Sequence, residues 1–397
     1  MSVASVALRR GHSSPWPTIV AYALVAGATQ MLWLTYAAIT TDAARRYGVS
    51  VGAIGWLSEI FPLLYVVLAL PAGWLLDRWF TPVLSAGALM VGVGGALRLV
   101  QVTFLWALVG QVWIAVAQPI VLSAVSKLAS EYLRESHRAT GIAIGSAGNL
   151  VGFIAALALG PALIAHGDLE RVLVVEAAIA LVPVAVLIVA LRRPGAYRDG
   201  SVVVSEGAAR TLWGQPAMRT LCGLVFLGFG LFVALATWLQ TLLQPSGVSD
   251  TTAGLLLVGM VASGIVGCAV CAPLVDARGA ERGFLLGTVI VSSVGCVVLA
   301  LASGVAGWAI GLVVMGGFLL PSLPVVLTAA ERLAGPLAGM AGAIVWMAGN
   351  LGGLVVAVIV QVLVHHPQAA FLTMGGVCAL GLPLAARLRL DRTRVSG

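Results

Sequence analysis

The side chains of this chain that could do chemistry lie inside long apolar segments. Gln30, Trp33 and Tyr36 follow one another along the first of these segments, and Glu59 lies about two turns into the second. Polar side chains are expensive to place in hydrocarbon, so they normally face a cavity or a partner. We therefore expect these four side chains to line the binding site of a small organic solute.

A matching set occurs in the second half of the chain. Trp238 and Gln240 share one apolar segment, and Trp346 and Asn350 lie one turn apart in another. Trp33, Trp238 and Trp346 could converge on a central cavity, where aromatic faces would attract a quaternary ammonium by cation–π interaction. The alternative is structural, because tryptophans also fill gaps in a core and anchor helices at membrane interfaces.

Other polar groups within the segments have two interpretations. A partly desolvated carboxylate can take up a proton, so Glu59 is a candidate coupling group as well as a candidate partner for a cation. Arg98 lies at a comparable depth and is its candidate ion-pair partner, whereas Glu176 is expected near the outer interface. Asn149 and Asn350 are each flanked by glycine. They could hydrogen-bond a substrate, bridge helices or line the closed inner gate, and a structural role is favoured.

The chain repeats itself about 200 residues apart. The pentapeptide that begins at Gly148 recurs with one change at Gly349, and Ser130-Glu131 recurs as Ala330-Glu331. The order of the repeated elements is the same in both halves. Two parallel repeats within an apolar chain are typical of secondary transporters.

One repeated motif predicts a helix-end contact. Gly73-x-x-x-Asp77-Arg78 recurs in weakened form around Asp276 and Arg278. Gly73 permits close helix approach, and Asp77 can accept hydrogen bonds from the N-terminal amides of a neighbouring helix. The long side chain of Arg78 can reach the headgroup layer. We expect these five positions to act in gating rather than in substrate choice.

Composition places the chain in a membrane. Hydrophobic residues make up 60% of it, charged residues make up 9%, and the mean hydropathy is +1.05. About 20 apolar residues are needed to cross a bilayer as a helix, and turn signals and charges divide the chain into twelve such stretches. The expected spans are 18–41, 52–76, 82–102, 104–128, 138–165, 170–191, 218–243, 251–275, 284–303, 306–330, 337–364 and 369–388.

Six spans precede a long polar connection, and six follow it. The sequence therefore predicts an N-terminal six-helix bundle at 1–192, a cytoplasmic linker at 193–216 and a C-terminal six-helix bundle at 217–397. With a cytoplasmic N-terminus, 18 of the 22 Lys and Arg residues fall on the inner side. This bias predicts that both termini of a multi-pass cell-membrane protein are cytoplasmic. The net charge of +7 is then explained by basic residues on the inner side of the membrane, and it does not indicate a nucleic-acid partner.

Signatures of other functions are missing from the sequence. It has no G-x-x-x-x-G-K-[ST] motif, so movement of a solute must be downhill or coupled to an ion gradient, with protons as the candidate ion. His365-His366 is an isolated pair, and Cys268-x-x-Cys271 lies in mid-segment, where small cysteines pack. We expect no enzymatic activity, no catalytic residues, no metal and no cofactor, and we expect a monomer whose partners are the bilayer and a small-molecule substrate.

The motif at Gly73–Arg78 resembles the loop signature of the major facilitator superfamily, and its echo lies where that family has a weaker second copy. The resemblance implies an all-α membrane protein of twelve transmembrane helices in two six-helix bundles. It also implies that the motif holds the inner gate.

The first half further resembles the FLVCR-related (solute carrier 49) family. The segments that carry this resemblance are Trp33-Leu34-Thr35-Tyr36, Tyr47-Gly48-Val49-Ser50, Trp56-Leu57-Ser58, Trp74-Leu75-Leu76-Asp77 and Gly148-Asn149 with Gly152. Members of that family transport choline and ethanolamine, and haem export has been attributed to some. Trp33 matches the tryptophan of the family's choline cage. The chain departs from the family pattern at Leu150, at Val233, where the seventh-helix aromatic is replaced, and at Glu59.

We therefore expect a secondary active or facilitative transporter of a small organic solute, such as a choline-like amine, that works by alternating access. One alternative is a proton-coupled exporter of drugs or metabolites, with Glu59 or Arg98 as the coupling element. Another, from a different class, is a membrane sensor or receptor that does not transport.

Overall fold

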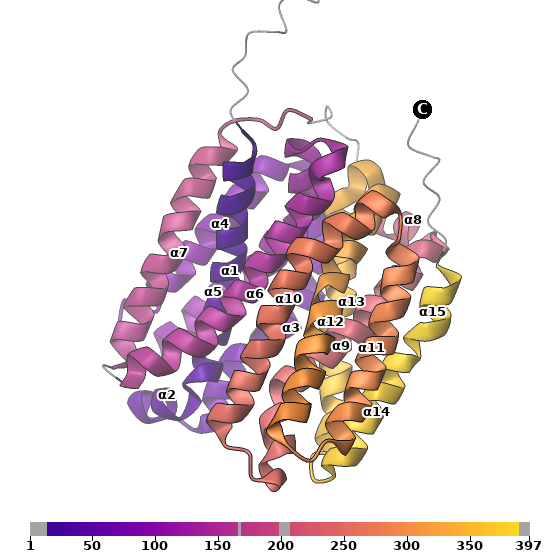
Figure 1. Ribbon diagram of the computed structural model, residues 1–397. Coiled ribbons are helices and arrows are strands. Elements are labelled where there is room, and N and C mark those ends of the chain that lie inside the picture. The colour runs from indigo at the N-terminus through magenta and orange to yellow at the C-terminus, as the bar shows by residue number, and fades with distance from the viewer. Residues whose placement is uncertain (1–13, 166–167, 198–206, 389–397) are drawn as a thin grey trace, which may run out of the picture.

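The computed structural model describes residues 14–165, 168–197 and 207–388, and within these ranges all regular structure is helical. Figure 1 shows long helices running roughly side by side through the whole molecule. The long helices are α1 (Trp16–Ala38), α3 (Val51–Arg78), α4 (Phe80–Leu97), α5 (Phe104–Tyr132), α6 (Glu135–Ala165), α7 (Leu169–Leu191), α9 (Pro216–Leu243), α10 (Asp250–Arg278), α11 (Glu281–Leu301), α12 (Val305–Ala334) and α13 (Ala338–Val362). The last crossing is divided into α14 (Pro367–Ala379) and α15 (Gly381–Arg387).

The described residues contain eleven apolar stretches that are long enough to cross a membrane. One of them, Val305–Val362, has 58 residues and contains both α12 and α13, which are separated by the short 3-10 helix η4 (Gly335–Leu337). The all-α fold of twelve spanning helices is therefore confirmed, with each helix close to its expected span. The gap of only three residues between α12 and α13 explains why the two helices merge when hydropathy alone is considered.

Local differences from the expected spans have clear causes. The first helix ends at Ala38, three residues early, because the backbone of Ile39 leaves the helical region at φ −135°. The charged segment after it forms a separate surface helix, α2 (Thr40–Tyr47), which ends at Gly48 in the left-handed conformation. Part of the expected linker also forms a short helix, α8 (Ala208–Gly214).

The repeat is visible in the backbone. Gly48-Val49-Ser50 precedes α3, and the same three residues, Gly247-Val248-Ser249, precede α10. Both glycines are left-handed, with φ of 67° and 77°, and both serines accept a hydrogen bond of 3.2 Å from the amide three residues later. A glycine stop followed by a serine N-cap therefore starts corresponding helices of the two repeats.

We use N-half for α1 and α3–α7 and C-half for α9–α15. In Figure 1 the purple N-half and the orange and yellow C-half lie side by side, and they touch where α3 meets α13 and α6 meets α10. Within the halves α1 packs on α6 and α9 packs on α13. A Cβ at Gly152 would run into the backbone of Gly27, and a Cβ at Gly352 would run into that of Phe226. Glycine therefore allows these pairs to pack backbone to backbone.

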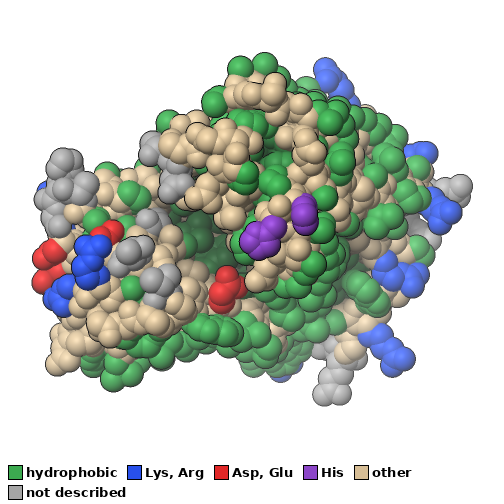
Figure 2. All heavy atoms as spheres, turned by 90° about the horizontal axis from the view of Figure 1, so that it is seen from below, with side chains coloured by type: hydrophobic (Ala, Val, Ile, Leu, Met, Phe, Trp, Pro, Cys, Tyr) green, Lys and Arg blue, Asp and Glu red, His purple; other side chains and the backbone are tan. Residues whose placement is uncertain are grey.

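The two ends of the molecule differ. The first described helix begins and the last one ends at the top of Figure 1, which we call the terminal face. Figure 2 views the opposite end, which is hollowed between the two halves, and we call it the open face. An acidic side chain and two histidines lie beside this hollow.

Candidate functional site

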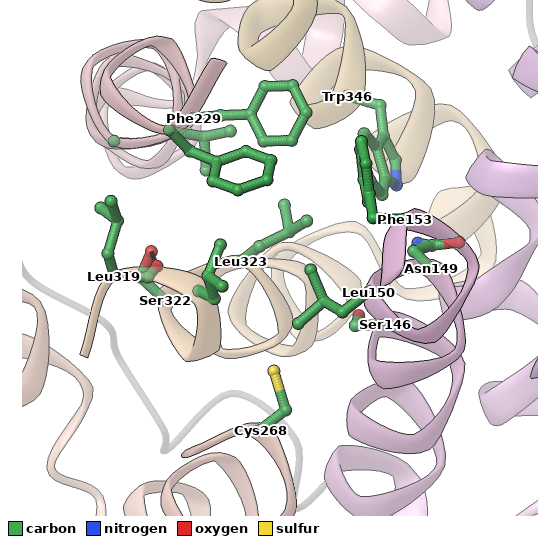
Figure 3. A pocket seen from close by; sticks show the side chains of 14 residues that line it. Ser146, Asn149, Leu150, Phe153, Phe229, Cys268, Leu319, Ser322, Leu323 and Trp346 are labelled. Atoms are coloured by element: carbon green, nitrogen blue, oxygen red, sulfur yellow. Dashed lines mark hydrogen bonds between the residues drawn. The ribbon is translucent and has the colours of Figure 1, made fainter. Parts of the chain in front are cut away.

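A central cavity lies at mid-depth between the two halves. It is a narrow space whose lining is mostly apolar. Helix α6 supplies its N-half wall, and α9, α10, α12 and α13 supply the remainder. The lining residues are Ser146, Asn149, Leu150, Phe153, Val225, Gly228, Phe229, Phe232, Cys268, Leu319, Leu320, Ser322, Leu323 and Trp346. Figure 3 shows Phe229 and Trp346 along one side, with Leu319 and Leu323 facing them.

Aromatic rings link the halves across this cavity. The ring of Phe153 on α6 meets Phe232 on α9 edge to face, with centroids 5.5 Å apart. Phe232 contacts Phe229 at 5.9 Å, and Phe229 meets Trp346 on α13 at 5.7 Å. All four residues line the cavity. The electron-rich faces of four neighbouring aromatic rings can attract an organic cation or stack on a planar solute.

The aromatic contacts continue into the N-half. Trp33 stacks on Phe61 at 6.0 Å and meets Phe153 edge to face at 5.8 Å. Tyr65, which belongs to α3, approaches Trp346 with ring centroids 6.4 Å apart. Phe61 and Tyr65 are one turn apart on α3, so seven rings form a nearly continuous belt through both halves.

Several buried polar atoms at the cavity have no hydrogen-bond partner. They are the indole Nε1 of Trp346, the Oδ1 of Asn149 and the hydroxyl of Ser146. Leaving a buried donor or acceptor unpaired costs about 1–3 kcal/mol, so a bound molecule that pairs with these atoms gains that energy. None of the fourteen lining residues is charged. The described residues also hold no group of three His, Cys, Asp or Glu that could bind a metal.

The structure places the three expected tryptophans differently. Trp346 lines the cavity. Trp33 does not line the cavity but packs against Phe153, which does, and the Nε1 of Trp33 donates to the carbonyl of Ser58 over 2.8 Å. Trp238 donates to the carbonyl of Ala357 over 3.0 Å and is outside the lining. A direct convergence of all three on one cavity is therefore wrong, because two of these indoles serve helix packing.

Two residues of the expected first-helix site are internal to the N-half. Tyr36 is fully buried, and its hydroxyl lies 3.1 Å from that of Tyr47. Gln30 is also buried, and its side-chain oxygen accepts from Gln118 over 3.3 Å. Neither residue lines the cavity, because their partners lie within the same half.

The expected pairing of Glu59 with Arg98 is wrong. Arg98 follows α4 with its side chain completely buried. It lies 3.4 Å from Glu176 and donates to Thr35 over 3.0 Å. Glu176 is equally buried and accepts from Thr35 over 2.5 Å, so its carboxylate lies inside the N-half. Glu59 is exposed and forms no ion pair within the described part of the chain.

The remaining expected site residues are Asn149, Asn350 and Gln240, and only the first lines the cavity. Asn149 lines the cavity with its oxygen unpaired. Asn350 is buried, and its amide donates to the carbonyl of Trp346 over 2.9 Å, one turn back on the same helix. Gln240 is exposed and lies outside the cavity lining.

At the terminal face, Asp77 joins the halves. Its two carboxylate oxygens accept hydrogen bonds of 2.8 Å from the amides of Gly339 and Met340, which begin α13. Lys127 of α5 donates to the carbonyl of Pro336 over 2.8 Å, and its ammonium group lies 3.8 Å from Asp77. A carboxylate at a helix N-terminus is stabilised by unpaired amides and by the helix dipole.

A second bridge crosses the halves at the same face. Arg138 on α6 pairs with Glu331 on α12 at 2.9 Å. Gly73 lets the helices come this close, since a Cβ there would lie 2.7 Å from the Cβ of Ala343 and 2.9 Å from the Cα of Met340. The terminal face is therefore closed by direct bonds between the halves, while the open face is hollowed (Figure 2).

The second copy of the motif differs from the first. Asp276 pairs with Arg332, which belongs to the same half and also bonds Glu281 at 3.2 Å. Arg278 is exposed, and Arg78 lies over the rings of Trp74 and Trp79 at 5.6 and 4.9 Å. These contacts do not join the halves.

The phenylalanines of the cavity were not predicted from the sequence; they are Phe153, Phe229 and Phe232. They carry no polar atom, and single phenylalanines in apolar helices look like lipid-facing or core residues. The one available signal was the spacing of Phe229 and Phe232, which places both rings on one face of α9. In the sequence, Lys127 and Arg138 were counted only among the basic residues of the inner side. In the structure both form contacts between the halves.

Known proteins with related sequences and structures are membrane transporters. A family model described as the Major Facilitator Superfamily matches residues 18–272. The solute carrier family 49 member A3 of Danio rerio is 25% identical over 402 residues, which covers 92% of this chain and 85% of the relative. The choline/ethanolamine transporter flvcr2a of Danio rerio is 24% identical over 323 residues, covering 75% and 68%.

Solved structures share the fold. The human organic anion transporter MFSD10 (TETRAN) superposes with a TM-score of 0.74 at 17% identity, over 94% of this chain and 98% of that one. The E. coli fucose:proton symporter FucP superposes with a TM-score of 0.73 at 16% identity, over 95% and 98%. A family model that spans well over half of the chain, together with this fold, shows that the protein belongs to the Major Facilitator Superfamily and is a secondary transporter of small solutes.

Proposed function

We propose that this transporter carries a small organic amine, of the choline type, through the central cavity. The observation that carries the proposal is an uncharged, aromatic-walled cavity at mid-depth with an unpaired indole donor. It lies between two halves whose described residues form hydrogen bonds and ion pairs with each other at the terminal face. Aromatic faces suit a quaternary ammonium, and the Nε1 of Trp346 would donate to an oxygen of the solute. Relatives named choline/ethanolamine transporters support the same substrate class.

Alternating access would follow from breaking the bonds of the terminal face. The N-half and the C-half would rock so that the cavity opens at one face at a time. We take the two bundles to be residues 1–192 and 217–397, joined by a linker at 193–216. We place both termini in the cytoplasm of a cell-membrane protein, which makes the hollow an external opening. The protein would act as a monomer, without enzymatic activity.

A second candidate is proton-coupled export of drugs or metabolites. It is favoured by Glu59, an exposed carboxylate within α3 that forms no ion pair among the described residues. Such a group could exchange protons with the hollow, whereas Arg98 is held by Glu176 and is the weaker candidate.

The test is ligand binding to the purified protein in lipid nanodiscs, measured as a thermal shift with choline, ethanolamine, an organic anion and a common drug. We expect choline to raise the melting temperature. Trp346→Phe, which keeps the ring but removes the donor, should weaken choline binding by about tenfold, equivalent to about 1.4 kcal/mol. The matched control is Trp238→Phe, whose indole bonds a helix carbonyl away from the cavity. No shift with choline or ethanolamine would reject the amine class.

A further inference from the structure

Helix α3 contains one short motif twice. Gly55-Trp56-Leu57-Ser58-Glu59 and Gly73-Trp74-Leu75-Leu76-Asp77 share the pattern Gly-Trp-Leu-x-acid, and the two copies are 18 residues apart. An α-helix has 3.6 residues per turn, so 18 residues correspond to about five full turns, or about 27 Å of helix. The two copies therefore lie on the same face of α3, toward its opposite ends.

The two copies differ in their contacts with α13. A Cβ at Gly73 would lie 2.7 Å from the Cβ of Ala343, and Asp77 is buried by the two amide hydrogen bonds that close the terminal face. In the other copy, a Cβ at Gly55 would meet no atom within 4 Å, and Glu59 is exposed. The face of α3 that touches α13 at one end is therefore free of it at the other.

Glu59 is directed toward the hollow of the open face. It lies about two turns inside the start of α3, on the face that carries Asp77. Figure 2 shows an acidic side chain beside this hollow, where the spacing along α3 also places Glu59. Closing the open face would bring α3 and α13 together here, as they already meet at the terminal face, and α13 would then cover Glu59.

The part of α13 that would cover Glu59 is uncharged. Helices α3 and α13 run in opposite directions, and Tyr65 approaches Trp346 at 6.4 Å. Glu59 lies six residues before Tyr65, so it would face α13 about six residues beyond Trp346. From residue 351 to 362 α13 has no charged side chain and a single polar one, that of Gln361. Covering a carboxylate with hydrocarbon is costly, so Glu59 must be neutralised before this face closes.

The helices packed against α3 leave Glu59 without a counter-ion. These helices are α1, α2, α4, α5 and α13, and Glu59 forms no ion pair among the residues that the structure describes. Helices α4 and α13 have no titratable side chain, and the charges of α5 lie in its last two turns, at the terminal face. The titratable side chains of α1, α2 and α5 are Tyr22, Tyr36, Asp42, Arg45, Arg46, Tyr47, Lys127, Glu131 and Tyr132.

We infer that Glu59 gates the open face, which closes only when a cation neutralises its carboxylate. A proton or the ammonium group of a bound solute would supply the positive charge. The surface at Gly55 would then pack on α13 as the surface at Gly73 does, so α3 carries one packing surface for each of the two closed states. The inference rests on the proposed function only where the charge comes from the ammonium group of the solute.

The first test measures the open face by spin-label distances in nanodiscs, at several pH values and without solute. Gln101, between α4 and α5, and Gln368 on α14 are exposed and belong to different halves, so cysteines there, with the five native cysteines replaced, report on this face. Because closure takes up one proton, the ratio of closed to open molecules should fall about tenfold per pH unit once Glu59 is ionised. In Glu59→Gln the ratio should not depend on pH. Two pH units above the titration of Glu59 it should exceed the wild-type ratio about 100-fold.

Control variants separate Glu59 from other groups. His365 and His366 are exposed beyond the end of α13, and replacing both with glutamine should keep the wild-type pH dependence. Gly55→Leu should fold, because a Cβ at this position meets no atom, but it should hold the open face open at every pH. Gly287→Leu is its matched control, since a Cβ there is equally free and α11 packs within the C-half, so this variant should close as the wild type does.

A second arm identifies the source of the charge. At a pH where the wild-type face is open, choline or tetramethylammonium should close it if the solute neutralises Glu59, and Glu59→Gln should not respond. If the proton is the source, acid alone closes the face. The inference is overturned if Glu59→Gln keeps the wild-type pH dependence, or if neither acid nor an ammonium ion closes the wild-type face.

The failure of the proposed function would look different. If choline gives no thermal shift, the amine proposal falls, and the acid arm still tests the gate. If choline binds but Glu59→Gln closes as the wild type does, the gate is rejected and the amine proposal stands.

Discussion

Asp77→Asn should open the terminal face. The carboxylate of Asp77 accepts one hydrogen bond of 2.8 Å from each of two amides at the start of α13, so it holds the N-half and the C-half together. An asparagine has one acceptor oxygen, so it can satisfy only one of these amides and presents its own donor to the other. The substitution also removes the charge that lies 3.8 Å from Lys127.

The size of the effect follows from the lost bond. A hydrogen bond to a charged group contributes about 1.5–3 kcal/mol, and each 1.4 kcal/mol changes an equilibrium constant tenfold. We therefore expect the ratio of molecules open at the terminal face to molecules closed there to rise by about 10- to 100-fold. Arg138–Glu331 remains in the variant and keeps part of the closure.

The assay is a distance measurement between spin labels at the terminal face. Ser136 on α6 and Arg219 on α9 are exposed and belong to different halves, so cysteines there, with the five native cysteines replaced, report on the separation of the halves. Asp276→Asn is the control, because Asp276 pairs with Arg332 inside its own half. The reasoning is refuted if Asp77→Asn keeps the wild-type distance distribution, or if Asp276→Asn changes it equally.

Three further predictions concern other parts of the molecule. Glu176→Ala should lower the free energy of unfolding by about 3–5 kcal/mol, because it leaves Arg98 buried without its counter-ion. Chemical denaturation would check this, and Arg98→Leu combined with Glu176→Leu should recover most of the loss. Glu59→Gln should leave substrate exchange in proteoliposomes intact but abolish accumulation against a gradient if Glu59 couples protons, whereas loss of binding itself would make it a cation partner. Gly73→Leu should prevent closure of the terminal face, since its Cβ already meets Ala343 at 2.7 Å, and intact closure by the same label distances would contradict this.

Residues in the aromatic belt show where sequence reasoning stops. Trp33 and Trp346 stand out in a sequence because tryptophan is large and carries a donor, and both lie in the belt. Phe153 and Phe232 do not stand out, yet their contact joins the halves beside the cavity. Which of several apolar side chains faces the cavity depends on the rotation of each helix against its neighbours, and hydropathy is nearly uniform around these helices.

The sequence by itself determined the membrane setting, the twelve crossings, the duplication and the motif at Asp77. These features are local: a run of about 20 apolar residues suffices for a crossing, and a glycine followed by a serine cap suffices to start a helix. Tertiary structure alone decided that Arg98 meets Glu176 instead of Glu59, and that Phe153 meets Phe232 between the two halves. Such pairings join residues that are far apart in the chain, so they depend on helix rotation and close packing, which composition does not encode.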